Sequence, residues 1–90
     1  MKIAVINPTP VLAPLPRPVR TASGSIDRFP LVLIDVTTDD GIEGRAYLQV
    51  YFREPLPALE RSVSGLAAMI AGMELAPRDL HAHLLKRCRL

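Results

Sequence analysis

The pattern of hydrophobic and polar residues changes its period near residue 54. Before that point the chain carries strand-like runs. Residues 31–38 are mostly apolar and rich in β-branched side chains, which is typical of a central strand. Asp39-Asp40-Gly41 follows, and Asp-Gly between two strand-like runs predicts a hairpin whose two turn residues tolerate positive φ.

The run after this turn alternates between apolar or small and polar residues up to Tyr51, which predicts another strand. We expect one of its faces to pack inward, namely Ile42, Gly44, Ala46, Leu48 and Val50.

The first thirty residues are harder to assign because they are rich in proline. Residues 2–6 predict a strand, and residues 7–19 carry five prolines, which fit an edge strand or an extended arm. We expect residues 20–30, with Gly24 in the middle, to form a loop without structure of its own. A loop of that length is often functional, so function is sought there first.

Apolar residues recur at helical spacing after residue 54. They form one stripe, Leu56, Leu59, Val63, Leu66, Ile70 and Met73. Pro55 and Pro57 fit only the first turn of this helix, and Gly72 suits its end. Gly65 inside this helix lowers its stability by about 1 kcal/mol relative to alanine. We expect that a neighbouring element packs closely against the helix at this position.

A second helix is predicted from Pro77 to about Arg87, with Leu80 and Leu84 on its buried face. The expected fold is therefore α+β, a three-stranded antiparallel meander followed by helices packed on one face. Residues 1–90 form a single domain or part of one, and a core this small is marginal.

The amino-acid composition argues against several classes of protein. The chain is 49% hydrophobic and 22% charged, which excludes a disordered chain and a membrane protein. A net charge of +2 is too small to indicate nucleic-acid binding. Neither a signal peptide nor a membrane span is recognisable. The single cysteine, Cys88, allows no disulfide within the chain and fits a cytoplasmic location.

Few residues suggest chemistry by their spacing. His81 and His83 are two apart on a predicted helix and so point to different sides, whereas helical metal pairs lie four apart. Cys88 has basic neighbours but no catalytic partner, and Asp39 and Asp40 suit a turn.

Asp35 shares a strand face with Leu31 and Leu33, so we expect it to be buried and to need a donor. Arg45 on the neighbouring strand is the candidate, in a structural pair. Because no nucleophile, phosphate-loop or metal motif is present, the residues alone do not support catalysis by this chain.

A combination of short segments spans nearly the whole chain. They are residues 14–15, 18–24, 30–35, 41–44, 46–48, 51, 66–70, 75–77 and 86–87. The combination resembles the N-terminal capping domain of mandelate racemase-like members of the enolase superfamily.

The resemblance implies a specific division of labour. In that family a (β/α)₈ barrel supplies the acid/base residues and the carboxylates that bind Mg²⁺, and the enzyme removes the proton α to a substrate carboxylate. The chain has only Lys2 and Lys86 as lysines and no counterpart of the barrel. It is therefore expected to be an incomplete cap with no cofactor and no catalytic residue of its own. Its expected partners are the barrel, a small carboxylic acid, and further copies in a homo-oligomer.

In the family, two segments of the cap close over the substrate and set specificity. They correspond here to residues 19–29 and 47–53, and the resemblance implies specificity roles for Val19, Thr21, Gly24, Ile26, Tyr47 and Tyr51. Ser23, Asp27 and Arg28 make the first segment more polar than in the racemase. We therefore expect a substrate more polar than mandelate, such as a sugar acid handled by dehydration, and both a racemase and an acid-sugar dehydratase remain open.

Two other classes remain open. A free-standing interaction module would dimerise through the apolar face that a missing barrel leaves uncovered. A nucleic-acid-binding protein would show salt-sensitive binding to DNA, but the small net charge disfavours it.

Overall fold

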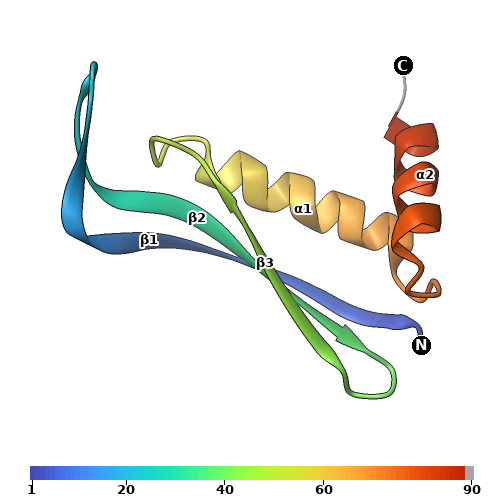
Figure 1. Cartoon of the computed structure of the whole chain (residues 1–90). Coiled ribbons are helices and arrows are strands. Elements are labelled where there is room, and N and C mark those ends of the chain that lie inside the picture. The colour runs from blue at the N-terminus through green and yellow to red at the C-terminus, as the bar shows by residue number, and fades with distance from the viewer. Residues whose placement is uncertain (89–90) are drawn as a thin grey trace.

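The computed structural model describes residues 1–88, which form a three-stranded sheet and two helices. The elements are β1 (Ile3–Thr21), β2 (Gly24–Thr38), β3 (Glu43–Gln49), α1 (Leu56–Ile70) and α2 (Pro77–Cys88). The strands lie in the order β1-β2-β3 and both pairs are antiparallel, so the α+β meander is confirmed. Helix α1 lies along one face of the sheet, and α2 crosses the end of α1 (Figure 1).

The proline-rich segment was expected to be either an edge strand or an extended arm, and it is part of the long edge strand β1. Val5 to Pro14 pair with Thr37 to Arg28 of β2. After Pro14 the register shifts, and Leu15–Pro18 form a bulge opposite Asp27 before pairing resumes at Val19. A bulge suits prolines, which cannot donate to a ladder.

The prediction of an unstructured loop over residues 20–30 was wrong. Only Ala22 and Ser23 form the turn, because pairing continues to Thr21 and Gly24. β1 and β2 thus extend together as a two-stranded hairpin beyond the rest of the sheet (Figure 1). The polar composition that suggested a loop reflects strands with no helix against them, so neither face needs to be apolar.

The hairpin between β2 and β3 is confirmed, but its turn differs from the one predicted. Residues 39–42 lie between the two strands, and the Thr38 N–H donates to the Ile42 carbonyl at 2.9 Å, which closes a loop of three residues, 39–41. Gly41 has φ +86°, whereas Asp40 has no positive φ. This geometry is that of a three-residue hairpin loop, which needs only one residue in the αL conformation to close the turn.

The core lies between α1 and one face of β2. Val32 is 0% exposed, and Leu56 and Val63 from α1 pack against it. Leu59, Ile34 and Val50 border this cluster. The predicted helical stripe is therefore confirmed in its first half, whereas Leu66 is exposed.

Two details correct the sequence analysis. Gly65 is not a close-packing site, because a Cβ placed there meets no atom within 4 Å. The strand β3 is exposed throughout, including Ala46 and Leu48 of its expected inward face, because α1 contacts β1 and β2 but has no contact with β3 among residues 1–88. Only Val50, just after the strand, packs against the core.

The opposite face of the sheet is covered by no helix in the described part of the chain. Asp35 lies there, exposed rather than buried as predicted. Its expected pairing with Arg45 is confirmed: the two residues are direct cross-strand partners, and Asp35 Oδ1 lies 3.5 Å from Arg45 Nε.

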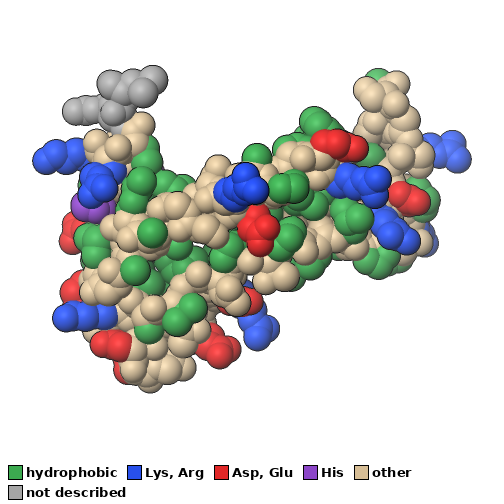
Figure 2. All heavy atoms as spheres, turned by 180° about the vertical axis from the view of Figure 1, so that it is seen from behind, with side chains coloured by type: hydrophobic (Ala, Val, Ile, Leu, Met, Phe, Trp, Pro, Cys, Tyr) green, Lys and Arg blue, Asp and Glu red, His purple; other side chains and the backbone are tan. Residues whose placement is uncertain are grey.

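The molecule is extended for its size. Its dimensions are 43 × 35 × 20 Å and its radius of gyration is 15.5 Å, whereas a compact chain of this length has a radius near 12 Å. The accessible surface is 6897 Å², compared with about 5,200 Å² for a compact monomer of this mass. Many hydrophobic side chains lie on that surface (Figure 2).

Candidate functional site

The tip of the β1–β2 hairpin is held in shape by its own side chains. The Thr21 hydroxyl donates to the Gly24 carbonyl at 2.9 Å and accepts the Ser23 N–H at 3.2 Å. Gly24 has φ +138°, a conformation that residues with a Cβ rarely adopt. The tip is therefore a defined turn, which displays the small polar side chains of Ser23 and Ser25.

The segment between β3 and α1, residues 50–55, faces the hairpin. Val50 anchors its start, since its N–H donates to the Pro30 carbonyl at 3.1 Å and its side chain packs against the core. The Leu56 N–H donates to the Arg53 carbonyl at 3.0 Å and closes the turn that leads into α1. Between these anchors, Tyr51 and Phe52 are 73% and 62% exposed.

The hairpin tip and this segment enclose a hollow of about 600 Å³. Its lining consists of Thr21, Ser23, Gly24, Ser25, Ile26, Tyr51 and Phe52. None of these residues is charged, and the lining combines hydroxyl groups with two aromatic rings. The hydroxyls of Ser23, Ser25 and Tyr51 make no side-chain hydrogen bond to another described residue, so they can donate to or accept from a ligand.

The structure brings together four of the six residues that the resemblance singled out. Thr21, Gly24, Ile26 and Tyr51 all line the hollow, although Gly24 and Tyr51 are 27 positions apart in the sequence.

Val19 and Tyr47 do not line it. Val19 lies beside the hollow as the cross-strand partner of Ile26, and Tyr47 lies opposite Leu33 on the uncovered face of the sheet.

Three lining residues, Ser23, Ser25 and Phe52, were not among these six, and Ser23 was noted only for its polarity. Ser25 and Phe52 each adjoin a residue that was, so adjacency to Ile26 and Tyr51 was the available signal. Asp27 and Arg28, which made the first segment look charged, are not in the lining. The polarity of the hollow rests on its hydroxyl groups instead.

The chemically reactive side chains lie elsewhere. Within residues 1–88, no group of three or more His, Cys, Asp or Glu side chains could hold a metal ion. His81, His83 and Cys88 all belong to α2, away from the hairpin tip (Figure 1). Neither α1 nor α2 combines the length and the apolar character that crossing a membrane requires.

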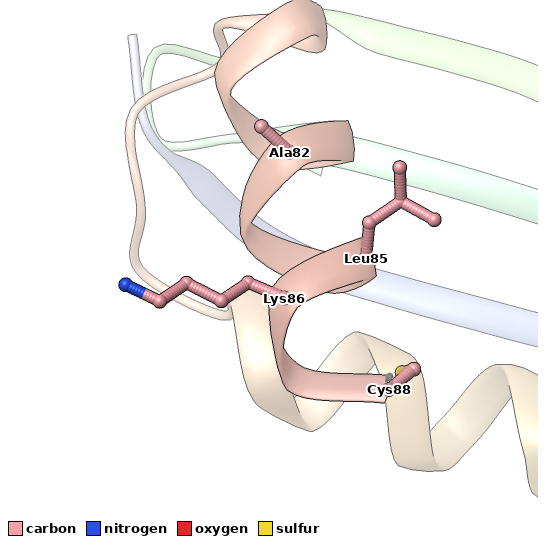
Figure 3. Close-up of a pocket in the computed structure, with 4 residues that line it drawn as sticks. All are labelled: Ala82, Leu85, Lys86 and Cys88. Atoms are coloured by element: carbon pink, nitrogen blue, oxygen red, sulfur yellow. The ribbon is translucent and has the colours of Figure 1, made fainter. Parts of the chain in front are cut away.

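A second hollow, of about 510 Å³, lies along α2 and is lined by Ala82, Leu85, Lys86 and Cys88 (Figure 3). Leu85 and Cys88 point to one side of the helix, whereas Lys86 extends to the other. Because the four lining residues that the structure describes come from one helix, they do not supply the converging polar groups that characterise a ligand site.

One carboxyl group has a perturbed pKa, and its role is structural. The Lys2 N–H donates to Asp39 Oδ1 at 2.9 Å, and this bond holds the pKa of Asp39 below its ordinary value. The bond joins the start of the chain to the β2–β3 turn, far from the hollow (Figure 1).

Comparison with known proteins shows which family of enzymes this domain resembles. Residues 4–90 match the N-terminal domain of the mandelate racemase / muconate lactonizing enzyme family. An enolase from Bradyrhizobium, solved with magnesium and mandelic acid, is 42% identical with a TM-score of 0.91 over 99% of this chain. An enolase from the alpha proteobacterium bal199, solved with bound magnesium, is 33% identical with a TM-score of 0.86 over 98% of the chain.

A more distant structure shares the fold alone. The L-Ala-D/L-Glu epimerase of Bacillus subtilis, in a substrate-liganded complex, is 23% identical with a TM-score of 0.76 over 96% of the chain. The chain spans about a quarter of the length of each of these three structures.

Proposed function

The chain belongs to the mandelate racemase / muconate lactonizing enzyme family as its N-terminal domain, and from this premise we propose that it caps the active site of a larger enzyme. The observation that carries the proposal is the hollow shared by the hairpin tip and the Tyr51–Phe52 segment. Two segments far apart in sequence form one concave, uncharged surface, which suits the outer part of a small ligand.

The rest of the site would come from polypeptide outside this chain. The uncharged lining of the hollow holds no group that could take a proton from carbon at neutral pH. The carboxylates of residues 1–88 do not fit Mg²⁺ either, because they form no cluster of ligands. We therefore assign metal binding and proton transfer to a barrel domain. This chain would form part of the wall of the active site and would cover the bound substrate.

The large exposed surface of the chain supports the proposal that a partner domain covers part of it. The accessible area exceeds that of a compact monomer by about 1,700 Å², and exposed hydrophobic side chains contribute to the excess. An area of this size is about twice what one partner contributes to a standard protein–protein interface, roughly 800 Å². Contact with a barrel would remove the surface from water.

We propose that the ligand is a carboxylic acid with a polar distal part. Ser23, Ser25 and Tyr51 offer hydroxyl groups, and Phe52 and Ile26 offer apolar contact. This mixture suits the alternating C–H and hydroxyl groups of a sugar acid, which favours a dehydratase over a racemase acting on an aromatic acid. Closing the cap over such a ligand would exclude water from the reaction. The whole enzyme would work in the cytoplasm, where the unpaired Cys88 would stay reduced.

The decisive experiment uses the 90-residue chain beside the longer protein of which it would be the first part. With Mg²⁺ in D₂O, we expect the longer protein to exchange the α-proton of a sugar acid and the 90-residue chain to exchange none. Turnover by the chain alone would contradict the proposal.

Variants of the longer protein test the hollow itself. We expect Tyr51→Ala to lower kcat/KM by about 10- to 100-fold, the range for losing one well-packed contact, and Ser23→Ala to lower it less. Ser64→Ala is the matched control, because Ser64 is an exposed serine on α1 outside the hollow. Equal kcat/KM for all three variants would exclude this hollow as a substrate contact.

A further inference from the structure

The two outer edges of the sheet are protected very differently. The outer edge of β1 is covered at its start by residues 72–75: the Ile3 N–H donates to the Met73 carbonyl at 2.9 Å, and the Gly72 N–H to the Ile3 carbonyl at 2.8 Å. Further along, prolines occupy β1. The edge of β3 has neither form of protection among the described residues.

The register shows which backbone groups of β3 are unpaired. The Thr38–Ile42 and Pro30–Val50 hydrogen bonds fix the even-numbered residues of this strand as those that bond to β2. The N–H and C=O groups of its odd-numbered residues therefore point away from the sheet. These residues are Glu43, Arg45, Tyr47 and Gln49. By the same alternation, Pro8, Pro10 and Pro14 occupy outward positions of β1 and block that edge.

We propose that the β3 edge pairs with the β3 edge of a second copy of this chain, in an antiparallel register centred on Ala46. In this register Arg45 lies opposite Tyr47 of the second copy, and Glu43 lies opposite Gln49. All four outward residues then form reciprocal pairs, which complete the ladder along the whole strand. The product is a two-fold symmetric, six-stranded sheet.

The side chains of β3 are complementary in this register. Arg45 across from an exposed Tyr47 is a favourable cation–aromatic pair on the uncovered face. On the helix face, Leu48, which is 40% exposed, lies opposite Gly44, whose missing side chain leaves room for it. No like charges lie opposite each other.

The neighbouring registers are less favourable. Centring the pair on Arg45 would place two guanidinium groups opposite each other and leave Gln49 unpaired, and like charges directly opposite are destabilising. Centring it on Tyr47 would leave Glu43 unpaired. Within residues 1–88 no helix contacts β3, although Leu75 and Pro77 border a hollow that residues 43–46 also line.

This inference goes beyond the capping function and does not depend on it. The first test is light scattering of the 90-residue chain at increasing concentration, in which we expect a dimer. Arg45→Pro should abolish the dimer because it removes an outward N–H, while the bonds of β3 to β2 are kept. Arg45→Thr is the matched control, since it keeps the N–H and removes the same charge, and it should weaken the dimer less. Circular dichroism of both variants should show unchanged strand content.

A second pair of variants tests the register by a gain of affinity. Gln49→Lys places a positive charge opposite Glu43 twice in the dimer, whereas Gln49→Glu places like charges there. We expect the dimer Kd to fall roughly 2- to 30-fold for Gln49→Lys and to rise by a similar factor for Gln49→Glu. A chain that stays monomeric at every concentration, or a dimer indifferent to Arg45→Pro and to both Gln49 variants, would overturn the inference.

Discussion

The Lys2 N–H donates to Asp39 Oδ1 at 2.9 Å, across 37 positions of sequence. The bond joins the strand that begins the chain to the turn between β2 and β3. The Asp39 N–H in turn donates to the Lys2 carbonyl at 2.9 Å, so the two residues are locked together by both backbone and side chain.

This contact predicts a pH dependence of stability. Because the bond lowers the pKa of Asp39 from 3.8, the folded state binds this proton less readily than the unfolded state. The stabilisation is therefore complete above pH 3.8 and is lost as the pH falls through the lower folded pKa. Urea unfolding at a series of pH values should show the difference between wild type and Asp39→Asn shrinking below that pH. In a Lys2→Pro background, which lacks the donor, Asp39→Asn should change the pH dependence little.

Truncating the most buried side chain should be costly. Val32 is fully buried between β2 and α1, so we expect Val32→Ala to lower the free energy of unfolding by about 2 kcal/mol. Val5→Ala is the matched control, since Val5 is 55% exposed, and it should cost less than about 0.5 kcal/mol. Equal losses in urea unfolding would contradict the position of the core.

Gly65 offers a stabilising substitution. It lies inside α1 with open space where a Cβ would be. Gly65→Ala should therefore raise the free energy of unfolding by about 0.5–1 kcal/mol, because alanine has the better helix propensity. Gly72→Ala is the contrasting variant: Gly72 has φ +79°, so the same change there should destabilise the chain. Thermal unfolding of the two variants should shift Tm in opposite directions.

The ion pair between Asp35 and Arg45 should contribute little. Both side chains are more than half exposed and are separated by 3.5 Å, and water and salt screen such pairs. A double-mutant cycle with Asp35→Ala and Arg45→Ala should give a coupling energy below about 1 kcal/mol that decreases as salt is added. A larger, salt-insensitive coupling would mean that the pair is buried in solution, for example beneath a partner.

Local sequence features were sufficient for most of the secondary structure. The β-branched run 31–38, the Asp-Gly turn and the apolar stripe from Leu56 predict β2, the hairpin and α1, because each depends on the spacing of neighbouring residues. The helix Pro77–Cys88 follows from the same kind of signal. The resemblance to a capping domain likewise followed from the order of short segments alone.

The tertiary structure determined which segments lie against each other and which side chains are buried. The residues around Gly24 looked like a loop, but pairing between β1 and β2 made them a hairpin, and only that hairpin brings the tip within reach of Tyr51. The side chain of Leu48 was expected inside and is exposed because α1 covers β1 and β2 instead of β3.

The physical reason for this division is the range of the interactions. Periodicity, proline and glycine act within a few residues, so the sequence alone predicts the type of an element and which of its residues share a face, but not the full lengths of β1 and β2. Whether a face meets a helix, water or a ligand depends on contacts between distant segments. Those contacts placed Tyr51 beside the hairpin tip and left the edge of β3 open.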